Sequence, residues 1–145
     1  ATHLIKIAVQ AALGLRSGMD VYGADYPTPD GSCLRDYIQV TDLVRAHMDA
    51  LRYLRAGGQS LACNCGYGEG YSVLDVIRVV KEVSGVDFPV KISGRRAGDA
   101  STLIADNKRI TSILRWRPIH NDLPQIIAQA LNWERRLHNA KSRMA

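Results

Sequence analysis

Several features that mark common protein classes are missing from this sequence. No apolar run approaches the roughly 20 residues that span a bilayer, and the first residues lack the basic start and cleavage site of a signal peptide. The basic residues are dispersed and form no stripe with interleaved aromatics, which make up only 6% of the chain. We therefore expect neither a membrane nor a nucleic acid as a partner.

Cysteine is also scarce. The three cysteines, Cys33, Cys63 and Cys65, form no even disulfide set, and no histidine lies near the C-x-C pair to complete a zinc site. We expect no metal, and we interpret Cys63 and Cys65 as small core residues on one face of a strand. The cysteine count fits a reducing, cytoplasmic location.

The motifs of several enzyme classes are lacking as well. None of the six tyrosines is followed by a lysine four residues later, and the chain has no G-x-S-x-G motif and no P-loop. The run NCGYGEGYSV, residues 64–73, places a glycine-rich turn before a helix, but it reads G-x-G-x-G rather than G-x-G-x-x-G. The sequence thus predicts no catalytic residue and no cofactor-binding residue in this chain.

The composition itself is that of an ordinary globular protein, with 46% hydrophobic and 23% charged residues. At 145 residues the chain is one domain or a piece of a larger one, and the amphipathic segment at its very start hints at a fragment. A net charge of +5 favours a small anionic ligand.

Apolar residues at helical spacing alternate along the chain with short strand-like runs. Helices are predicted from about residue 4 to 15, from Thr41 as N-cap to the glycines at 57–58, from Ser72 to Gly85, after Asp106, and from Asp122 onward. Strands are predicted over Asp20–Tyr22, Arg35–Val40, Leu61–Cys65, Val90–Ser93 and Leu103–Ala105. This alternation predicts an α/β fold.

The predicted strand Arg35–Val40 follows a stiff loop with two prolines and a Pro-Asp-Gly turn. Alternation along a strand puts Arg35 and Tyr37 on one face, and Ile38 and Val40 on the other, toward a core. An arginine in this place matches phosphate oxygens. The alternative is a surface salt bridge from Arg35 to Asp36 or to Asp42.

A second candidate site is GRRAGDAS, residues 94–101. Two adjacent arginines between glycines can place one guanidinium on an anion, while Asp99 holds the loop or a sugar hydroxyl. The alternative is a solvated loop in which the charges pair with each other.

Five motifs in order carry a resemblance that covers nearly the whole chain. They are VYGADYPTPDGSCLRDYIQVTDL from Val21, NCGYGEGYSVLDVI from Asn64, RRAGDASTLIAD from Arg95, LRWRP from Leu114 and LNWERR from Leu131. With these motifs the chain resembles the C-terminal half of UDP-glucose 4-epimerases, which are extended short-chain dehydrogenases/reductases.

The resemblance implies a domain arrangement. Residues 1–145 would be the C-terminal UDP-sugar-binding portion of an extended enzyme of that family. The helix at 41–56 and the strand at 61–65 would complete an N-terminal Rossmann domain, so that residues 41–66 pack on its sheet. That N-terminal part would bind NAD, supply the Tyr-x-x-x-Lys base and form a homodimer, and the chain alone would be inactive.

The resemblance also implies an activity and a set of substrate-binding residues. The enzyme would interconvert UDP-glucose and UDP-galactose through a 4-keto intermediate. Arg35 and Arg96 would bind the pyrophosphate, and Tyr22 would stack on the uracil. Leu4, the Asp20–Val21 backbone and Val73 would line the base pocket. Tyr37 and Asp99 would contact the ribose or support the arginines, and Leu103 would help to set the size of the sugar pocket.

Four positions depart from the family pattern: His3, Gln39, Cys65 and Arg115 stand where the family has other residues. None of them is a predicted phosphate partner, so the departures bear on the identity of the sugar. An epimerase of UDP-pentoses or UDP-N-acetylhexosamines, or a dehydratase or decarboxylase of the same family, is the alternative. From a different class, a non-catalytic nucleotide-sugar-binding module is a further alternative.

Overall fold

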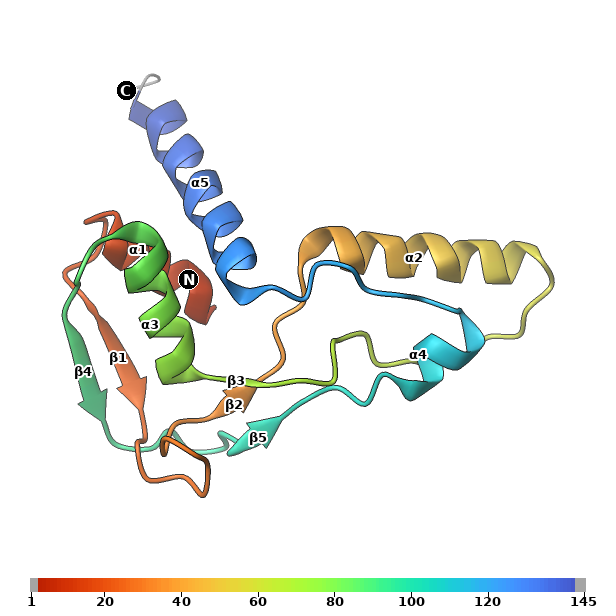
Figure 1. The fold of residues 1–145 in the computed structure, drawn as a ribbon, viewed down its shortest axis with the longest axis horizontal. Helices are drawn as coiled ribbons and strands as arrows, with labels where there is room; N and C mark the ends of the chain where they lie inside the picture. Colours follow the sequence, from red (N-terminus) through yellow and green to blue (C-terminus); the bar gives the residue numbers. More distant parts are fainter. Residues whose placement is uncertain (1–2, 143–145) are drawn as a thin grey trace. The chain divides into compact units, whose positions relative to one another are not determined.

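A computed structural model of the chain describes residues 3–142 and confirms the α/β prediction (Figure 1). The helices are α1 (Leu4–Ala12), α2 (Val40–Arg55), α3 (Val73–Ser84), α4 (Lys108–Ile113) and α5 (Leu123–Ser142). The strands are β1 (Met19–Tyr22), β2 (Leu34–Arg35), β3 (Tyr71–Ser72), β4 (Val90–Ser93) and β5 (Thr102–Leu103). Within residues 3–142, no helix is both long enough and apolar enough to cross a membrane.

The chain divides into two compact units, each built from separate stretches of sequence. The first comprises Ala1–Cys33, Ser72–Ser101 and Asp122–Ala145, and therefore contains α1, β1, α3, β4 and α5. The second comprises Leu34–Tyr71 and Thr102–Asn121, with α2, α4, β2 and β5.

The first unit is a small β-α-β arrangement covered by helices. Strands β1 and β4 pair in parallel, with Met19 opposite Val90 and Tyr22 opposite Ser93. Parallel strands need a crossover connection, and α3 provides it. Helix α1 packs against α3, α5 and β1, and α3 also packs against α5. The core residues with at most 1% exposure in this unit are Ala8, Val9, Val21, Val76, Val80 and Ile127.

Helix α3 has the predicted ends. The Ser72 hydroxyl accepts a hydrogen bond from the Asp75 amide at 2.9 Å, and the Asp75 carboxylate accepts one from the Ser72 amide at 3.4 Å. This is a capping box, which satisfies amides that have no partner within the helix. Gly85 ends the helix at φ 69°, in the left-handed region that glycine adopts without strain.

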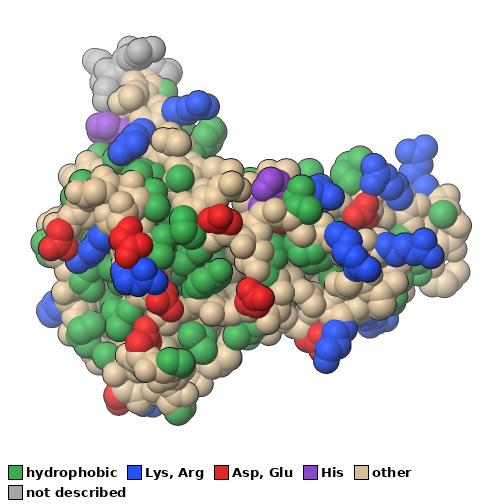
Figure 2. Space-filling view, viewed as in Figure 1, with side chains coloured by type: hydrophobic (Ala, Val, Ile, Leu, Met, Phe, Trp, Pro, Cys, Tyr) green, Lys and Arg blue, Asp and Glu red, His purple; other side chains and the backbone are tan. Residues whose placement is uncertain are grey.

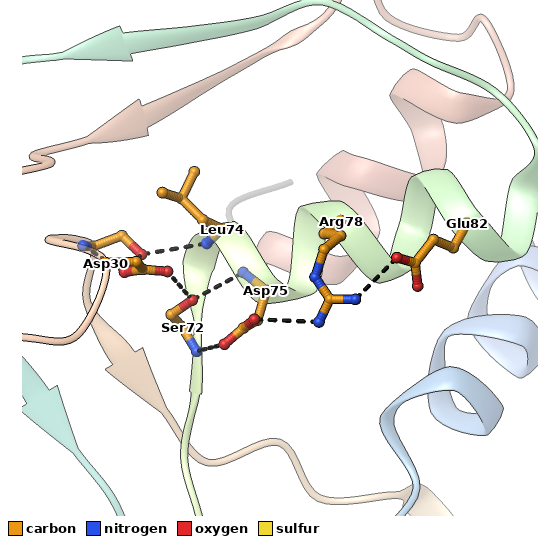
Figure 3. A network of polar contacts seen from close by, with 7 residues as sticks. Asp30, Ser72, Leu74, Asp75, Arg78 and Glu82 are labelled. Carbon is orange, nitrogen blue, oxygen red and sulfur yellow. Dashed lines mark hydrogen bonds and ion pairs between the residues drawn. The ribbon is translucent and has the colours of Figure 1, made fainter.

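The stiff loop before β2 is tied to the start of α3 by a network of polar contacts (Figure 3). The Asp30 carboxylate accepts hydrogen bonds from the Ser32 amide at 2.9 Å, the Ser32 hydroxyl at 2.8 Å and the Ser72 hydroxyl. The Ser32 hydroxyl in turn accepts one from the Leu74 amide at 3.3 Å. Although burial alone raises the pKa of Asp30, the hydrogen bonds from Ser72 and Ser32 lower it below the usual value. The loop is thereby fixed to the start of α3, which lies about 40 residues later in the sequence.

The second unit has a small apolar cluster of its own. Ala46, Ile110 and Trp116 are buried together, and Ile38, Cys63, Cys65 and Leu114 pack against them. The Trp116 indole donates a hydrogen bond to the Asp42 carbonyl oxygen at 3.0 Å, which links the segment after α4 to the first turn of α2. Strands β2 and β5 pair in parallel, and the order of the sheet is β3-β2-β5.

The predicted strand Arg35–Val40 is wrong beyond Arg35. Pairing with β5 covers only Leu34 and Arg35, and the Gln39 side chain then caps α2 by accepting hydrogen bonds from the Thr41 and Asp42 amides. Gln39, rather than Thr41, is therefore the N-cap. Val40 begins the helix and is 66% exposed, so it does not face a core.

The predicted strand Leu61–Cys65 is also not observed. A strand is defined by hydrogen bonds to a neighbouring strand, and in the described part of the chain no strand pairs with this segment. Cys63 and Cys65 nevertheless pack against the apolar cluster, as expected of small core residues. The last predicted strand is shifted to Thr102–Leu103, and the two-residue β3 was not predicted.

Candidate functional site

In the first unit, Tyr22 and Arg96 form a stacked pair. The Arg96 guanidinium carbon lies 4.0 Å from the centroid of the Tyr22 ring. Both side chains are exposed, and Tyr22 keeps 40% of its surface accessible. Because Tyr22 ends β1 opposite Ser93 of β4, the loop that leaves β4 carries Arg96 back to the ring. An aromatic face and a cation thus meet at one place, which suits a ligand with a base and a phosphate.

Arg95, the neighbour of Arg96, has a different set of contacts. Its guanidinium lies 4.3 Å from the centroid of the buried Tyr26 ring, and its Nε donates to the Asp25 carboxylate at 2.8 Å. The hydrogen bond from Arg95 lowers the pKa of Asp25 below its usual value. Gly23, at φ 84°, has no room for a side chain, since an added Cβ would lie 2.5 Å from the Tyr26 ring and 2.9 Å from Arg95. Arg95 is therefore held in the fold.

The other residues predicted to bind the base lie near the same elements. Val21 is buried on β1, and Asp20 accepts a hydrogen bond from the Ser93 hydroxyl at 3.1 Å. Leu4 begins α1 and Val73 begins α3, and both are half-buried. The Val73 amide donates to the Cys33 carbonyl oxygen at 3.0 Å.

In the second unit, Arg35 and Leu103 border one open cavity. Its volume is about 510 Å³, and its walls include Ile38, Cys63, Asn64, Cys65 and Ala105. This volume lies within the range of small-molecule sites. Arg35 and Leu103 are directly opposite each other in the β2–β5 pair, and Leu103 is 65% exposed. The structure therefore brings together the predicted phosphate ligand and the predicted sugar-pocket residue of this unit.

The wall of this cavity is fixed by Asp36, which the sequence suggested only as a possible salt-bridge partner of Arg35. Its carboxylate accepts hydrogen bonds from the amides of Tyr67 at 3.1 Å, Gly68 at 3.1 Å and Ala105 at 3.4 Å. Three segments of the second unit therefore meet at one side chain. No local signal predicts this, because the partners are 31 to 69 residues away.

The glycine-rich turn at 66–70 does not fit a dinucleotide phosphate. Such a site needs free backbone amides at the turn, but those of Tyr67 and Gly68 already donate to the Asp36 carboxylate. A carboxylate at this place also repels a phosphate. These two amides are therefore not available to a phosphate. In residues 3–142, no group of His, Cys, Asp or Glu side chains is arranged to hold a metal ion.

A buried carboxylate, Asp42, holds the segment that follows α4. It is fully buried and accepts hydrogen bonds from the Tyr67 hydroxyl at 3.0 Å and from the amides of Ile119 at 3.0 Å and His120 at 2.8 Å. The Tyr67 hydroxyl also accepts from the Gln39 amide at 3.2 Å. Burial, together with the hydrogen bond to Asp42, raises the pKa of Tyr67 to about 12.

The predicted site residues thus form two sets, one in each unit. Leu4, Asp20, Val21, Tyr22, Val73, Arg96 and Asp99 belong to the first unit, and Arg35, Tyr37 and Leu103 belong to the second. Asp99 donates its amide to the Arg96 carbonyl oxygen at 3.3 Å and so closes the turn that presents Arg96. Tyr37 is buried, with 8% of its surface exposed.

Several known proteins similar to this chain are described as UDP-glucose 4-epimerases. No family model matches the chain. A curated UDP-glucose 4-epimerase of Azospirillum brasilense is 51% identical over 140 residues, which are 97% of this chain and 40% of the relative. The solved UDP-Glc/GlcNAc 4-epimerase of Campylobacter jejuni is 46% identical, with a TM-score of 0.86 over 94% of this chain and 41% of the other.

A third similar protein carries ligands. The UDP-glucose 4-epimerase of Stenotrophomonas maltophila, solved with bound NAD and formylated UDP-arabinopyranose, is 37% identical. Its TM-score is 0.92 over 97% of this chain and 41% of that chain. This chain therefore spans about two fifths of the length of the proteins that it matches.

Proposed function

We propose that this chain, which belongs to the UDP-glucose 4-epimerase family of extended short-chain dehydrogenases/reductases, is the UDP-sugar-binding part of an enzyme that interconverts UDP-glucose and UDP-galactose. The observation that carries the proposal is the contact between Tyr22 and Arg96. The contact brings to one place the two groups that a nucleoside diphosphate needs, an aromatic ring for the base and a guanidinium for the phosphates.

The proposed roles follow the family resemblance. Arg35 and Arg96 bind the pyrophosphate, because a guanidinium matches phosphate oxygens bidentately. Tyr22 stacks on the uracil, and Leu103 borders the sugar pocket. Leu4, the Asp20–Val21 backbone and Val73 line the base pocket. Tyr37 and Asp99 contact the ribose or support the two arginines.

The redox chemistry is assigned to residues outside this chain. The glycine-rich turn is occupied by the Asp36 carboxylate, and no tyrosine precedes a lysine by four residues. NAD, bound elsewhere in the whole protein, supplies the oxidising and reducing capacity at C4 of the hexose. The present chain holds the UDP moiety, and binding energy from this non-reacting part orients the sugar. We therefore expect the isolated chain to be catalytically inactive.

Helix α2 presents a surface suited to the rest of such an enzyme. Its exposed apolar side chains recur at helical spacing and keep 46% to 66% of their surface accessible: Val40, Val44, Met48, Leu51 and Leu54. Figure 2 shows hydrophobic side chains on the surface of the second unit together with many Lys and Arg side chains. Exposed apolar surface of this kind marks an interaction site. In the proposed enzyme, residues 41–66 pack on the sheet of the NAD-binding domain.

The proposed enzyme is a cytoplasmic homodimer that assembles through residues outside this chain. The location is supported by three cysteines that are all free, as expected in a reducing compartment. The dimer rests on the family resemblance alone.

The test is an assay of the full-length protein with UDP-glucose and with UDP-galactose, with identification of the product formed from each. We expect each sugar nucleotide to yield the other. Failure to form UDP-galactose from UDP-glucose, with UDP-N-acetylglucosamine or a UDP-pentose epimerised instead, would assign another sugar to the same scaffold.

The binding role is tested separately by calorimetry with UDP. Arg96→Ala should weaken UDP binding by about 2 kcal/mol, or about thirtyfold, as expected for a lost charge-assisted hydrogen bond. Arg78→Ala is the charge-matched control, because Arg78 is exposed on α3 and pairs with Asp75 and Glu82. Equal affinities of the Arg96→Ala variant and the native protein would exclude Arg96 as a phosphate ligand.

A further inference from the structure

Arg96 covers the ring that the proposed function assigns to the uracil. With the guanidinium carbon 4.0 Å from the ring centroid, one face of Tyr22 is in van der Waals contact with the arginine. A base cannot stack on that face while Arg96 stays there. The side chain expected to bind phosphate therefore occupies one face of the ring that is expected to bind the base.

Arg96 can leave the ring without breaking an ion pair. In the structure of residues 3–142, its contact is with the Tyr22 ring, and no carboxylate forms an ion pair with it. Arg95, by contrast, is held by Asp25 and by the Tyr26 ring. A Cβ added at Gly94 or at Gly98 would lie in open space, so the backbone on either side of the arginine pair is not packed against other parts of the protein at these two positions.

A diphosphate competes well for this arginine. A guanidinium bound to phosphate forms charge-assisted hydrogen bonds in a fixed geometry, whereas an exposed cation–π contact is among the weaker interactions of a protein surface. A nucleoside without phosphates has no such acceptor for the Arg96 guanidinium, so it does not compensate for the loss of the contact with the ring.

We propose that the Arg96 side chain covers the Tyr22 ring and is released from it by the phosphates of a bound nucleotide. In the free protein it lies on the ring; when a nucleoside diphosphate binds, the phosphates draw the guanidinium away and open the ring to the base. The cover makes the site selective for nucleotides over free nucleosides. This inference rests on the proposed function, since it takes Tyr22 as the base platform and Arg96 as a phosphate ligand.

The test measures the affinity of the full-length protein for uridine and for UDP by calorimetry. An exposed cation–π contact makes the covered state about two to five times as populated as the open state, so only about one third to one sixth of the free protein has an open ring. Removal of the cover should therefore raise the affinity for uridine about three- to sixfold. We therefore expect Arg96→Ala to bind uridine more tightly and UDP more weakly than the native protein. These opposite signs are specific to a residue that both covers the ring and binds phosphate.

Two further variants serve as controls. Arg95→Ala removes the same charge from the same loop but leaves the Tyr22 ring covered, so its affinity for uridine should not rise. The double variant with Tyr22→Ala and Arg96→Ala should bind uridine no more tightly than Tyr22→Ala alone, because no ring remains to be uncovered.

Each unfavourable outcome has a distinct meaning. If Arg96→Ala binds uridine no better than the native protein, the cover is refuted, while UDP binding by the native protein leaves the proposed function intact. A gain for uridine that Arg95→Ala reproduces refutes the cover as well, since the gain then comes from charge. Native protein that binds neither UDP nor uridine refutes both the cover and the proposed function.

Discussion

Replacing Asp42 should destabilise the second unit more than replacing any exposed carboxylate on the same helix. The Asp42 side chain is fully buried and accepts three hydrogen bonds of 2.8 to 3.0 Å at Oδ2, from the Tyr67 hydroxyl and from the amides of Ile119 and His120. A hydrogen bond to a charged group contributes about 1.5–3 kcal/mol, and a buried donor left without a partner costs about 1–3 kcal/mol.

The two substitutions at this position should differ in size. In Asp42→Ala the amides of Ile119 and His120 lose their acceptor, and the Tyr67 hydroxyl keeps only the His120 carbonyl oxygen at 3.1 Å. We therefore expect a loss of about 4 kcal/mol of unfolding free energy, as for other broken buried charge contacts. In Asp42→Asn one oxygen can still take the place of Oδ2 and accept from the same donors, but without charge assistance. We expect this variant to lose about 2 kcal/mol.

The assay is urea unfolding of the full-length protein, with hydrogen exchange at the amides of Ile119 and His120 to locate the effect. Asp49→Asn is the matched control, because Asp49 lies on the same helix and forms a surface ion pair with Arg52 at 2.9 Å. Such pairs contribute less than about 0.5 kcal/mol. The reasoning is refuted if Asp42→Ala costs under about 1 kcal/mol, or if the two amides keep their protection.

Two other substitutions test single features of the second unit. Arg115 has φ 54°, in the left-handed region, so Arg115→Gly should stabilise the protein by about 0.5–1 kcal/mol in thermal unfolding, whereas Arg109→Gly inside α4 should destabilise it by a similar amount. The pKa of Tyr67 is about 12 in the folded protein, against about 10 in the unfolded chain. The contribution of the Tyr67 hydroxyl to the free energy of unfolding is therefore complete below pH 10 and is lost as the pH rises through 12. The stability advantage of the native protein over Tyr67→Phe should therefore shrink from pH 9 to pH 11 in urea unfolding, and a constant difference would contradict it.

Helices were easier to predict from this sequence than strands, because helix signals are local. Ser72 and Asp75 are three residues apart and Gly85 directly follows the last turn, so both ends of α3 can be read from the chain. Strands β2, β3 and β5 have two residues each, and their ends depend on which distant residue is opposite. The predicted strand over 35–40 failed for this reason, since only one of its residues, Arg35, has a partner in β5.

The same distinction holds for the candidate site. The residue types of Tyr22 and Arg96 suggest nucleotide binding, but their contact arises from the pairing of β1 with β4, whose residues are about 70 positions apart. The covered ring could not be predicted from either motif. Nor could Asp36, because its three amide partners come from segments that carry no signal of their own.

Three aspartates of this chain differ from Arg96 in their contacts, which supports the proposal that Arg96 is available to an anion. Asp30, Asp36 and Asp42 each accept hydrogen bonds from backbone amides within their own unit, and so hold loops and helix starts in place. These three carboxylates are therefore engaged by hydrogen bonds within the protein. The guanidinium of Arg96 lies instead on an exposed ring. Substitution of these aspartates should therefore change stability, and substitution of Arg96 should change ligand affinity with little effect on stability.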